Sequence, residues 1–168
     1  IAIDADGTIT LGKLRSSGTG NLVIHSGSVV DAADGATDIV ANLALLVITA
    51  VGGIGNGNAI ETQVKAMDLL NTGSGDISVI EVDALDLRHV DQQGTGAVDI
   101  RTLAGNLVVM DLGVRATSGA VDLYAGGGGL TVGGDGVTTT GGGITLVAER
   151  GDLLLDAAER VFQRRGVS

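Results

Sequence analysis

Apolar residues recur in the second half of the chain as triplets whose first and third members are apolar. In a β-strand these two side chains point to one face, and the middle side chain points to the other. Each triplet follows a turn that contains glycine, so the pattern predicts short strands joined by tight turns. The first series is Ile77 to Val79, Val98 to Ile100, Val121 to Leu123 and Ile144 to Leu146, with starts 21, 23 and 23 residues apart.

Two further series keep this period. The second is Leu85/Leu87, Leu107/Val109, Leu130/Val132 and Leu153/Leu155, and the third is Val90, Val114, Val137 and Val161. Such self-similarity at a fixed period is the mark of a repeat architecture. A strand of three to five residues cannot bury a face alone, but equivalent strands stacked about 4.8 Å apart can. We therefore predict an all-β fold, a parallel β-helix (β-solenoid) with three short strands in each coil of about 22–24 residues.

The same reasoning assigns interior rows and boundaries. One row is Leu107, Leu130 and Leu153, and another is Val98, Val121 and Ile144. In the N-terminal part, Ile1/Ile3 and Leu22/Ile24 are assigned to the first series, Ile9/Leu11 to the second and Leu14 to the third. We expect residues 1–168 to form a single solenoid segment, with regular coils over residues 71–168.

Residues 29–70 have irregular apolar spacings, so we expect at least one atypical coil or protruding loop there. An alternative stays open for residues 61–70. Val64, Met67 and Leu70 stand at helical spacing and would also fit a short helical turn.

Composition supports a core of small stackable residues. The chain has 44% hydrophobic residues and 29 glycines, but one Phe, one Tyr, no Trp and no proline. The absence of cysteine excludes disulfides and thiolate metal sites. A net charge of −10 argues against a nucleic-acid partner, whose protein surface would be basic. The longest apolar stretch, Leu43 to Val51, is much shorter than the roughly 20 residues of a membrane helix, so no membrane insertion is expected.

Two segments carry a family resemblance. The stretch from Gly52 to Thr62 and the run from Asn71 to Leu87 resemble the repeat arrays of giant bacterial surface proteins of the filamentous-haemagglutinin type. The resemblance covers most of the chain and is clearest from Ile39 to Leu155. It implies a right-handed parallel β-helical stalk that is exported to the bacterial cell surface or the extracellular space. There it would act in adhesion or cell-to-cell contact.

Parallel β-helices also include polysaccharide lyases and hydrolases, which place clustered carboxylates in a groove. The best candidates are Asp99 and Asp122, which are outward middle residues of adjacent coils, about 5 Å apart. Ser78 and Thr145 take this place in the flanking coils, so the acidic row is only two residues long, and no Arg or Lys is expected beside it. We therefore expect no enzyme activity and assign no catalytic residue.

Other motifs are interpreted as structural. The glycines of 126–129 and 133–136 lack the nine-residue calcium-binding repeat, so they are assigned to turns. His25 and His89 have no partner at ligand spacing and are assigned to solvated turns. Thr138 to Thr140 has no threonines in neighbouring coils to build an ice-binding array. The sequence predicts no metal site and no cofactor.

The C-terminal run contains a basic patch, made of Arg150, Arg160, Arg164 and Arg165. It is interpreted as a solvated turn, with a contact to an acidic neighbour as the alternative.

Val167 stands one period after Ile144, and only 157–163 could form a cap, so we expect the solenoid to continue at both ends. The expected partners are copies of the chain, or its own continuation, stacked end to end, and a ligand on a host or neighbouring cell. Two functions stand: a structural or adhesive stalk segment, and a carbohydrate-active β-helix.

Overall fold

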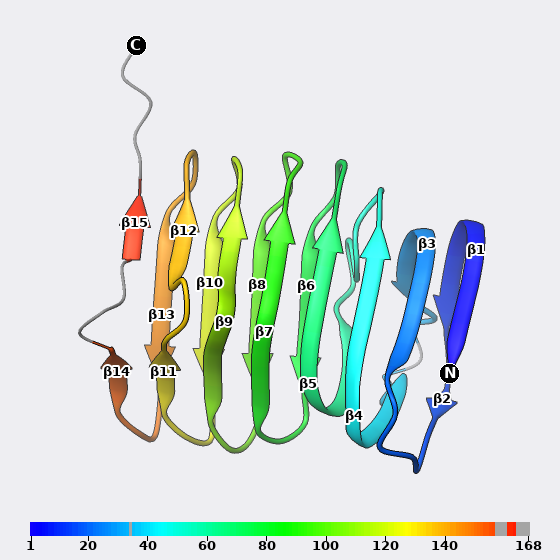
Figure 1. The fold of residues 1–168 in the computed structure, drawn as a ribbon, viewed down its shortest axis with the longest axis horizontal. Helices are drawn as coiled ribbons and strands as arrows, with labels where there is room; N and C mark the ends of the chain where they lie inside the picture. Colours follow the sequence, from blue (N-terminus) through cyan, green and yellow to red (C-terminus); the bar gives the residue numbers. More distant parts are fainter. Residues whose placement is uncertain (34, 157–160, 164–168) are drawn as a thin grey trace.

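The structure, a computed structural model, describes residues 1–33, 35–156 and 161–163. The described residues form an all-β molecule without helices, in which parallel strands stack as a β-solenoid of about 7 turns with about 23 residues per turn. The coils follow one another along a single long axis (Figure 1). The predicted fold class is confirmed.

Fifteen strands build the coils in the described part of the chain. Their bounds are β1 Ala2–Leu11, β2 Leu14–Arg15, β3 Leu22–Asp31, β4 Ile39–Ala50, β5 Ile60–Asn71, β6 Ile77–Glu81, β7 Leu85–Gln92, β8 Val98–Thr102, β9 Leu107–Ala116, β10 Val121–Ala125, β11 Leu130–Val132, β12 Val137–Thr139, β13 Ile144–Ala148, β14 Leu153–Leu155 and β15 Val161–Gln163.

The predicted register of the regular coils is confirmed in all three series. On the first face, β10 pairs in parallel with β8 and β13, so Val121 lies between Val98 and Ile144. On the second face, Leu130 of β11 pairs with Leu107 and Leu153. On the third, Val137 of β12 pairs with Val114 and Val161.

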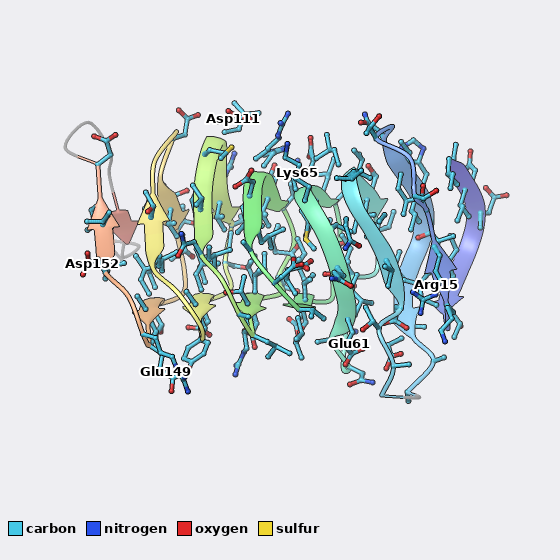
Figure 2. The ribbon with its side chains drawn as sticks, turned by 90° about the horizontal axis from the view of Figure 1, so that it is seen from below. Arg15, Glu61, Lys65, Asp111, Glu149 and Asp152 are labelled. Atoms are coloured by element: carbon cyan, nitrogen blue, oxygen red, sulfur yellow. The ribbon has the colours of Figure 1, made fainter. Side chains whose placement is uncertain are left out.

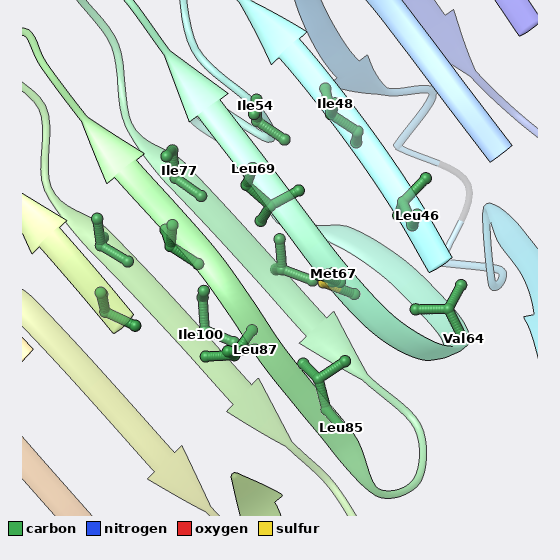
Figure 3. Packing of buried hydrophobic residues seen from close by; sticks show 14 of the residues in the cluster. Leu46, Ile48, Ile54, Val64, Met67, Leu69, Ile77, Leu85, Leu87 and Ile100 are labelled. Carbon is green, nitrogen blue, oxygen red and sulfur yellow. The ribbon is translucent and has the colours of Figure 1, made fainter. Parts of the chain in front are cut away.

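The apolar rows form one continuous core. Val98, Val121, Leu107 and Leu130 are fully buried, as predicted. Figure 3 shows like residues stacked coil upon coil, such as Met67 beside Leu87. The end of the row differs, because no described strand pairs with β14 on the side away from β11. Leu153 is therefore in register but 45% exposed.

The assignment of the N-terminal residues to faces is wrong. Leu22 aligns with Leu46 of β4, and through β5 with Leu87, so it belongs to the second face. Ile24 belongs to the third face, because the same ladder leads through Ile48 and Leu69 to Val90.

The remaining N-terminal positions shift in the same way. Ile3 pairs with Ile24 on the third face, and Ile9 pairs with Val29, which bridges through Ile54 to Ile77 on the first. Leu14 pairs with Ile39, which pairs with Thr62 and so continues to Glu81 at the end of the first face. All three faces carry the same apolar alternation, so the pattern alone does not say which face a triplet occupies.

The irregular region contains two departures from the repeat, as expected. The segments 32–38 and 55–59 lie between strands of the first face, and both lengthen the chain between residues that stack on one another. The helical alternative for residues 61–70 is wrong, because they lie in β5, whose ladder partners are β4, β6 and β7. Burial of alternate residues along this strand overrides their helical spacing.

Glycine is required where turns of successive coils touch. A Cβ on Gly94 would lie 1.7 Å from the carbonyl oxygen of Gly73 one coil away. A Cβ on Gly119 would lie 1.9 Å from the carbonyl oxygen of Gly96. These contacts account for the glycine-rich turns that precede each first-face strand.

Several sequence predictions fall outside the described residues. They concern the side chains of Arg160, Arg164 and Arg165, the position of Val167 and the capping segment that begins at Ala157.

Candidate functional site

Three acidic residues meet in the irregular region. Asp31 is the last residue of β3, Asp38 immediately precedes β4, and Glu61 is the second residue of β5. One carboxylate oxygen of each lies within 4.8 Å of the others. The backbone fixes two of them, because the Asp38 amide donates to the Glu61 carbonyl at 2.9 Å and the Glu61 amide donates to Asp38 Oδ2 at 3.0 Å.

The environment of this acidic cluster disfavours negative charge. Asp38 is fully buried, and desolvation raises its pKa to about 7, with further increases from the charges of Asp31 and Glu61. The hydrogen bond from the Glu61 amide opposes this rise. Asn58, in the segment before β5, donates from its side-chain amide to Asp31 Oδ2. The cluster therefore brings three carboxylates together, with the Asn58 side-chain amide bound to one of them.

A second buried carboxyl group belongs to Glu81, at the end of β6. Its side chain points inward because it follows Ile77 and Val79 at strand period. It accepts hydrogen bonds from the Thr62 hydroxyl at 2.7 Å and from the Val64 amide at 3.2 Å. Burial nevertheless raises its pKa to about 8.

Inward amides form a ladder at the turn between the third and first faces. Asn71 and Gln92 pair in register at the ends of β5 and β7, and both are fully buried. The Asn71 amide donates to the carbonyl of Gly75 at 2.9 Å, and the Gln92 amide donates to the same oxygen at 2.6 Å. The Gly94 amide donates to Gln92 Oε1 at 3.1 Å. The two side chains therefore supply hydrogen-bond partners for backbone groups of the turns that point into the interior.

The predicted carboxylate pair is present, since Asp99 and Asp122 are direct ladder partners on β8 and β10. The expectation of no basic neighbour is wrong. Arg101 donates from Nε to Asp99 Oδ1 at 2.8 Å and from Nη2 to Asp99 Oδ2 at 2.9 Å. Residues two apart on a strand share a face, so this ion pair could have been predicted from the sequence.

An open hollow lies beside the pair and is lined by Asp76, Asp99 and Asp122, together with Asn58 and glycines of the preceding coil. Asp76 Oδ1 accepts a hydrogen bond from the Ala97 amide at 2.8 Å, which closes a turn. Two of the three carboxylates in this hollow therefore have structural partners.

The assignment of His25 and His89 to turns is wrong, because both lie in strands. His89 lies in β7 rather than in a turn, and its Nδ1 is 3.2 Å from Asp68 Oδ1 of the neighbouring coil. His25 lies in β3, where it pairs with Asp4 and Thr49. Thr138 pairs with Arg115 rather than with a threonine.

The glycines of 126–129 lie in the turn between β10 and β11, as assigned. Arg150 lies at the turn after β13 and lines an open hollow with Tyr124 and Glu149. The Tyr124 hydroxyl donates to Glu149 Oε2 at 2.6 Å.

Comparisons with protein-family models, with curated proteins and with solved structures found no match to this chain. Within the part of the chain that the structure describes, no helix is long and apolar enough to cross a membrane.

Proposed function

We propose that this chain is a stalk segment of a bacterial cell-surface or extracellular filament protein, with a structural and adhesive role. The observation that supports this most is the unbroken parallel stacking from β1 to β14 along one axis (Figure 1). A solenoid with a filled core keeps its length while presenting turns and outward side chains to its surroundings. The net charge of −10 keeps such a surface soluble.

The location can be tested on cells that make the protein. Antibodies raised against the purified chain should label intact cells in immunogold electron microscopy, on material that extends from the outer surface. Cells that lack the gene should lose the label and adhere less to neighbouring cells or to host surfaces. Labelling confined to the interior of sectioned cells would contradict the proposal.

The partner we propose is a further length of solenoid, from the same chain or from another copy. Leu153 and Leu155 continue the row of Leu130 and Val132 but are 45% and 53% exposed. Covering them with another coil would bury apolar side chains and pair the edge of β14 that no described strand pairs. Analytical ultracentrifugation should show oligomers whose size grows with concentration, and Leu155→Asp should reduce this growth. A monomer across the whole concentration range would contradict stacking.

A carbohydrate-active function is the second candidate, because Asp76, Asp99 and Asp122 line one hollow. Asp122 would be the acid or base, since Asp99 is held by Arg101. Under the stalk proposal we expect no turnover of pectin, alginate or related acidic polysaccharides. Release of unsaturated or reducing ends that is lost in Asp122→Ala, but kept in Asp86→Ala, would favour this candidate instead.

A further inference from the structure

One member of the acidic cluster of Asp31, Asp38 and Glu61 occupies a position that is apolar in other coils. Asp31 stands two residues after Val29, as Val79 stands two residues after Ile77. Its ladder partner in the preceding coil is Leu11. A carboxylate thus replaces an inward apolar side chain where the segments 32–38 and 55–59 interrupt the first face. Glu61 is labelled in Figure 2, at the start of β5.

One oxygen of each carboxylate in this cluster lacks a donor. Asp31 Oδ1, Asp38 Oδ1 and Glu61 Oε2 are buried, and none has a hydrogen-bond partner among the described residues. Asp38 is 0% exposed and Asp31 is 9% exposed, so these oxygens have almost no contact with bulk solvent. Among the described residues, Arg101 forms an ion pair with Asp99 and His89 contacts Asp68, and neither pair reaches the cluster. Buried carboxylates without a donor or a cation are strongly unfavourable.

The spacing of the oxygens suits one shared cation. Two oxygens bound to the same Ca²⁺ at 2.3–2.6 Å lie at most about 5.2 Å apart. The three carboxylates here each offer an oxygen within 4.8 Å of the other two. Asn58 donates to Asp31 Oδ2 from its side-chain nitrogen, so it orients this carboxylate and is not counted among the oxygen ligands.

The ligand chemistry selects the ion. All the groups are oxygens, so the cluster lacks the imidazole and thiolate ligands preferred by zinc and copper. The three carboxylates come from the end of β3, the residue before β4 and the start of β5, so they do not form a regular octahedral set. Ca²⁺ accepts such variable coordination, whereas Mg²⁺ requires a nearly ideal octahedron. We propose that Asp31, Asp38 and Glu61 bind a calcium ion. The ion ties β3, β4 and β5 together where the repeat is interrupted.

The alternative to a cation is a proton, since a protonated Asp38 would also relieve the repulsion among these carboxylates. The test therefore uses the whole chain at pH 8, where a proton competes less. We expect 1 mM CaCl₂ to raise the melting temperature by about 5 °C or more relative to EGTA. Asp38→Asn and Glu61→Gln should each abolish the shift and weaken calcium binding at least about tenfold in titration calorimetry.

Asp86→Asn is the matched control. It removes one negative charge from an outward position of β7, away from the cluster, and should keep the full shift. Asp38→Asn removes one of three repelling charges, so it should fold in EGTA, and Glu61→Gln changes a residue that is only half-buried. Equal melting temperatures of the wild type in CaCl₂ and in EGTA would overturn the proposal. An undiminished shift in both cluster variants, or an equal shift with MgCl₂, would also overturn it.

Discussion

The side-chain amide of Asn71 donates a hydrogen bond to the side-chain carbonyl of Gln92, one coil further along, at 3.1 Å. Both side chains are buried, and both also bind backbone groups of the turns that lead into the first face. The ladder therefore joins two turns as well as two strands. Its hydrogen bonds are worth most as a set, because each member left alone would be an unsatisfied polar group in the core.

Gln92→Leu is the first prediction. It leaves the Asn71 side chain, the Gly75 carbonyl and the Gly94 amide without one partner each. We expect the free energy of unfolding, measured by urea denaturation, to fall by about 2–4 kcal/mol. Ser74→Ala is the control, because Ser74 is an exposed residue of the same turn and accepts from Asn71 through its backbone carbonyl. Equal losses in the two variants would show that the ladder does not stabilise the turns.

The second prediction concerns the core. Leu130→Asp places a carboxylate between Leu107 and Leu153 without a partner, and we expect a loss of several kcal/mol. Thr131→Asp, one residue along the same strand, introduces the same charge on the outward side and should change the stability much less. The two midpoints in urea give the comparison, and a tolerated Leu130→Asp would refute the inward register.

Close packing of turns is the basis of the third prediction. In Gly94→Ala the new methyl group would overlap the Gly73 carbonyl, whereas in Gly143→Ala it would meet no atom within 4 Å. We expect Gly94→Ala to separate the two turns and to lower the melting temperature strongly or prevent folding. Gly143→Ala should fold with nearly unchanged stability. Circular dichroism melts of both variants check this, and a stable Gly94→Ala would mean that the turns are not in contact.

The fourth prediction is a pH dependence. The folded-state pKa of Glu81 is about 8, above its value of 4.5 in the unfolded chain, so the folded protein binds the proton more tightly. Its contribution is complete below about pH 4.5 and is lost as the pH rises towards 8. We expect a decrease in unfolding free energy of a few kcal/mol over this range. The decrease should become smaller in Glu81→Gln, measured by urea denaturation with EGTA at several pH values.

Asp38 titrates over part of the same range, so Asp38→Asn with Glu81→Gln gives the reference that lacks both carboxyl groups with a raised pKa. An unchanged pH profile in Glu81→Gln would show that this carboxyl group keeps its charge in the folded protein.

The regular coils were predictable because spacing alone defines their register. Ile77, Val98, Val121 and Ile144 each follow a glycine turn at nearly constant steps, and the ladder pairs them as expected. The N-terminal faces were not predictable, because the step of 21 residues from Ile3 to Ile24 is equally compatible with any face.

The sites divide in a similar way. Glu81 points inward because it follows Val79 at strand period, and Arg101 shares a face with Asp99, so both features could have been predicted from the sequence. The acidic cluster could not have been predicted in this way. Asp31, Asp38 and Glu61 are brought together by two loops whose lengths break the period, and their contact depends on the register across those loops.

The strands run across the long axis of the solenoid, so the hydrogen bonds between coils lie along this axis. A force along the axis therefore acts directly on these hydrogen bonds. A pull on the two ends of the solenoid would open one coil at a time, because each coil is bonded only to its neighbours. Each release would free about 23 residues, and these could extend by about 75 Å. Such a molecule would yield in small, repeated steps rather than in a single rupture, and would absorb work while its remaining coils stay folded.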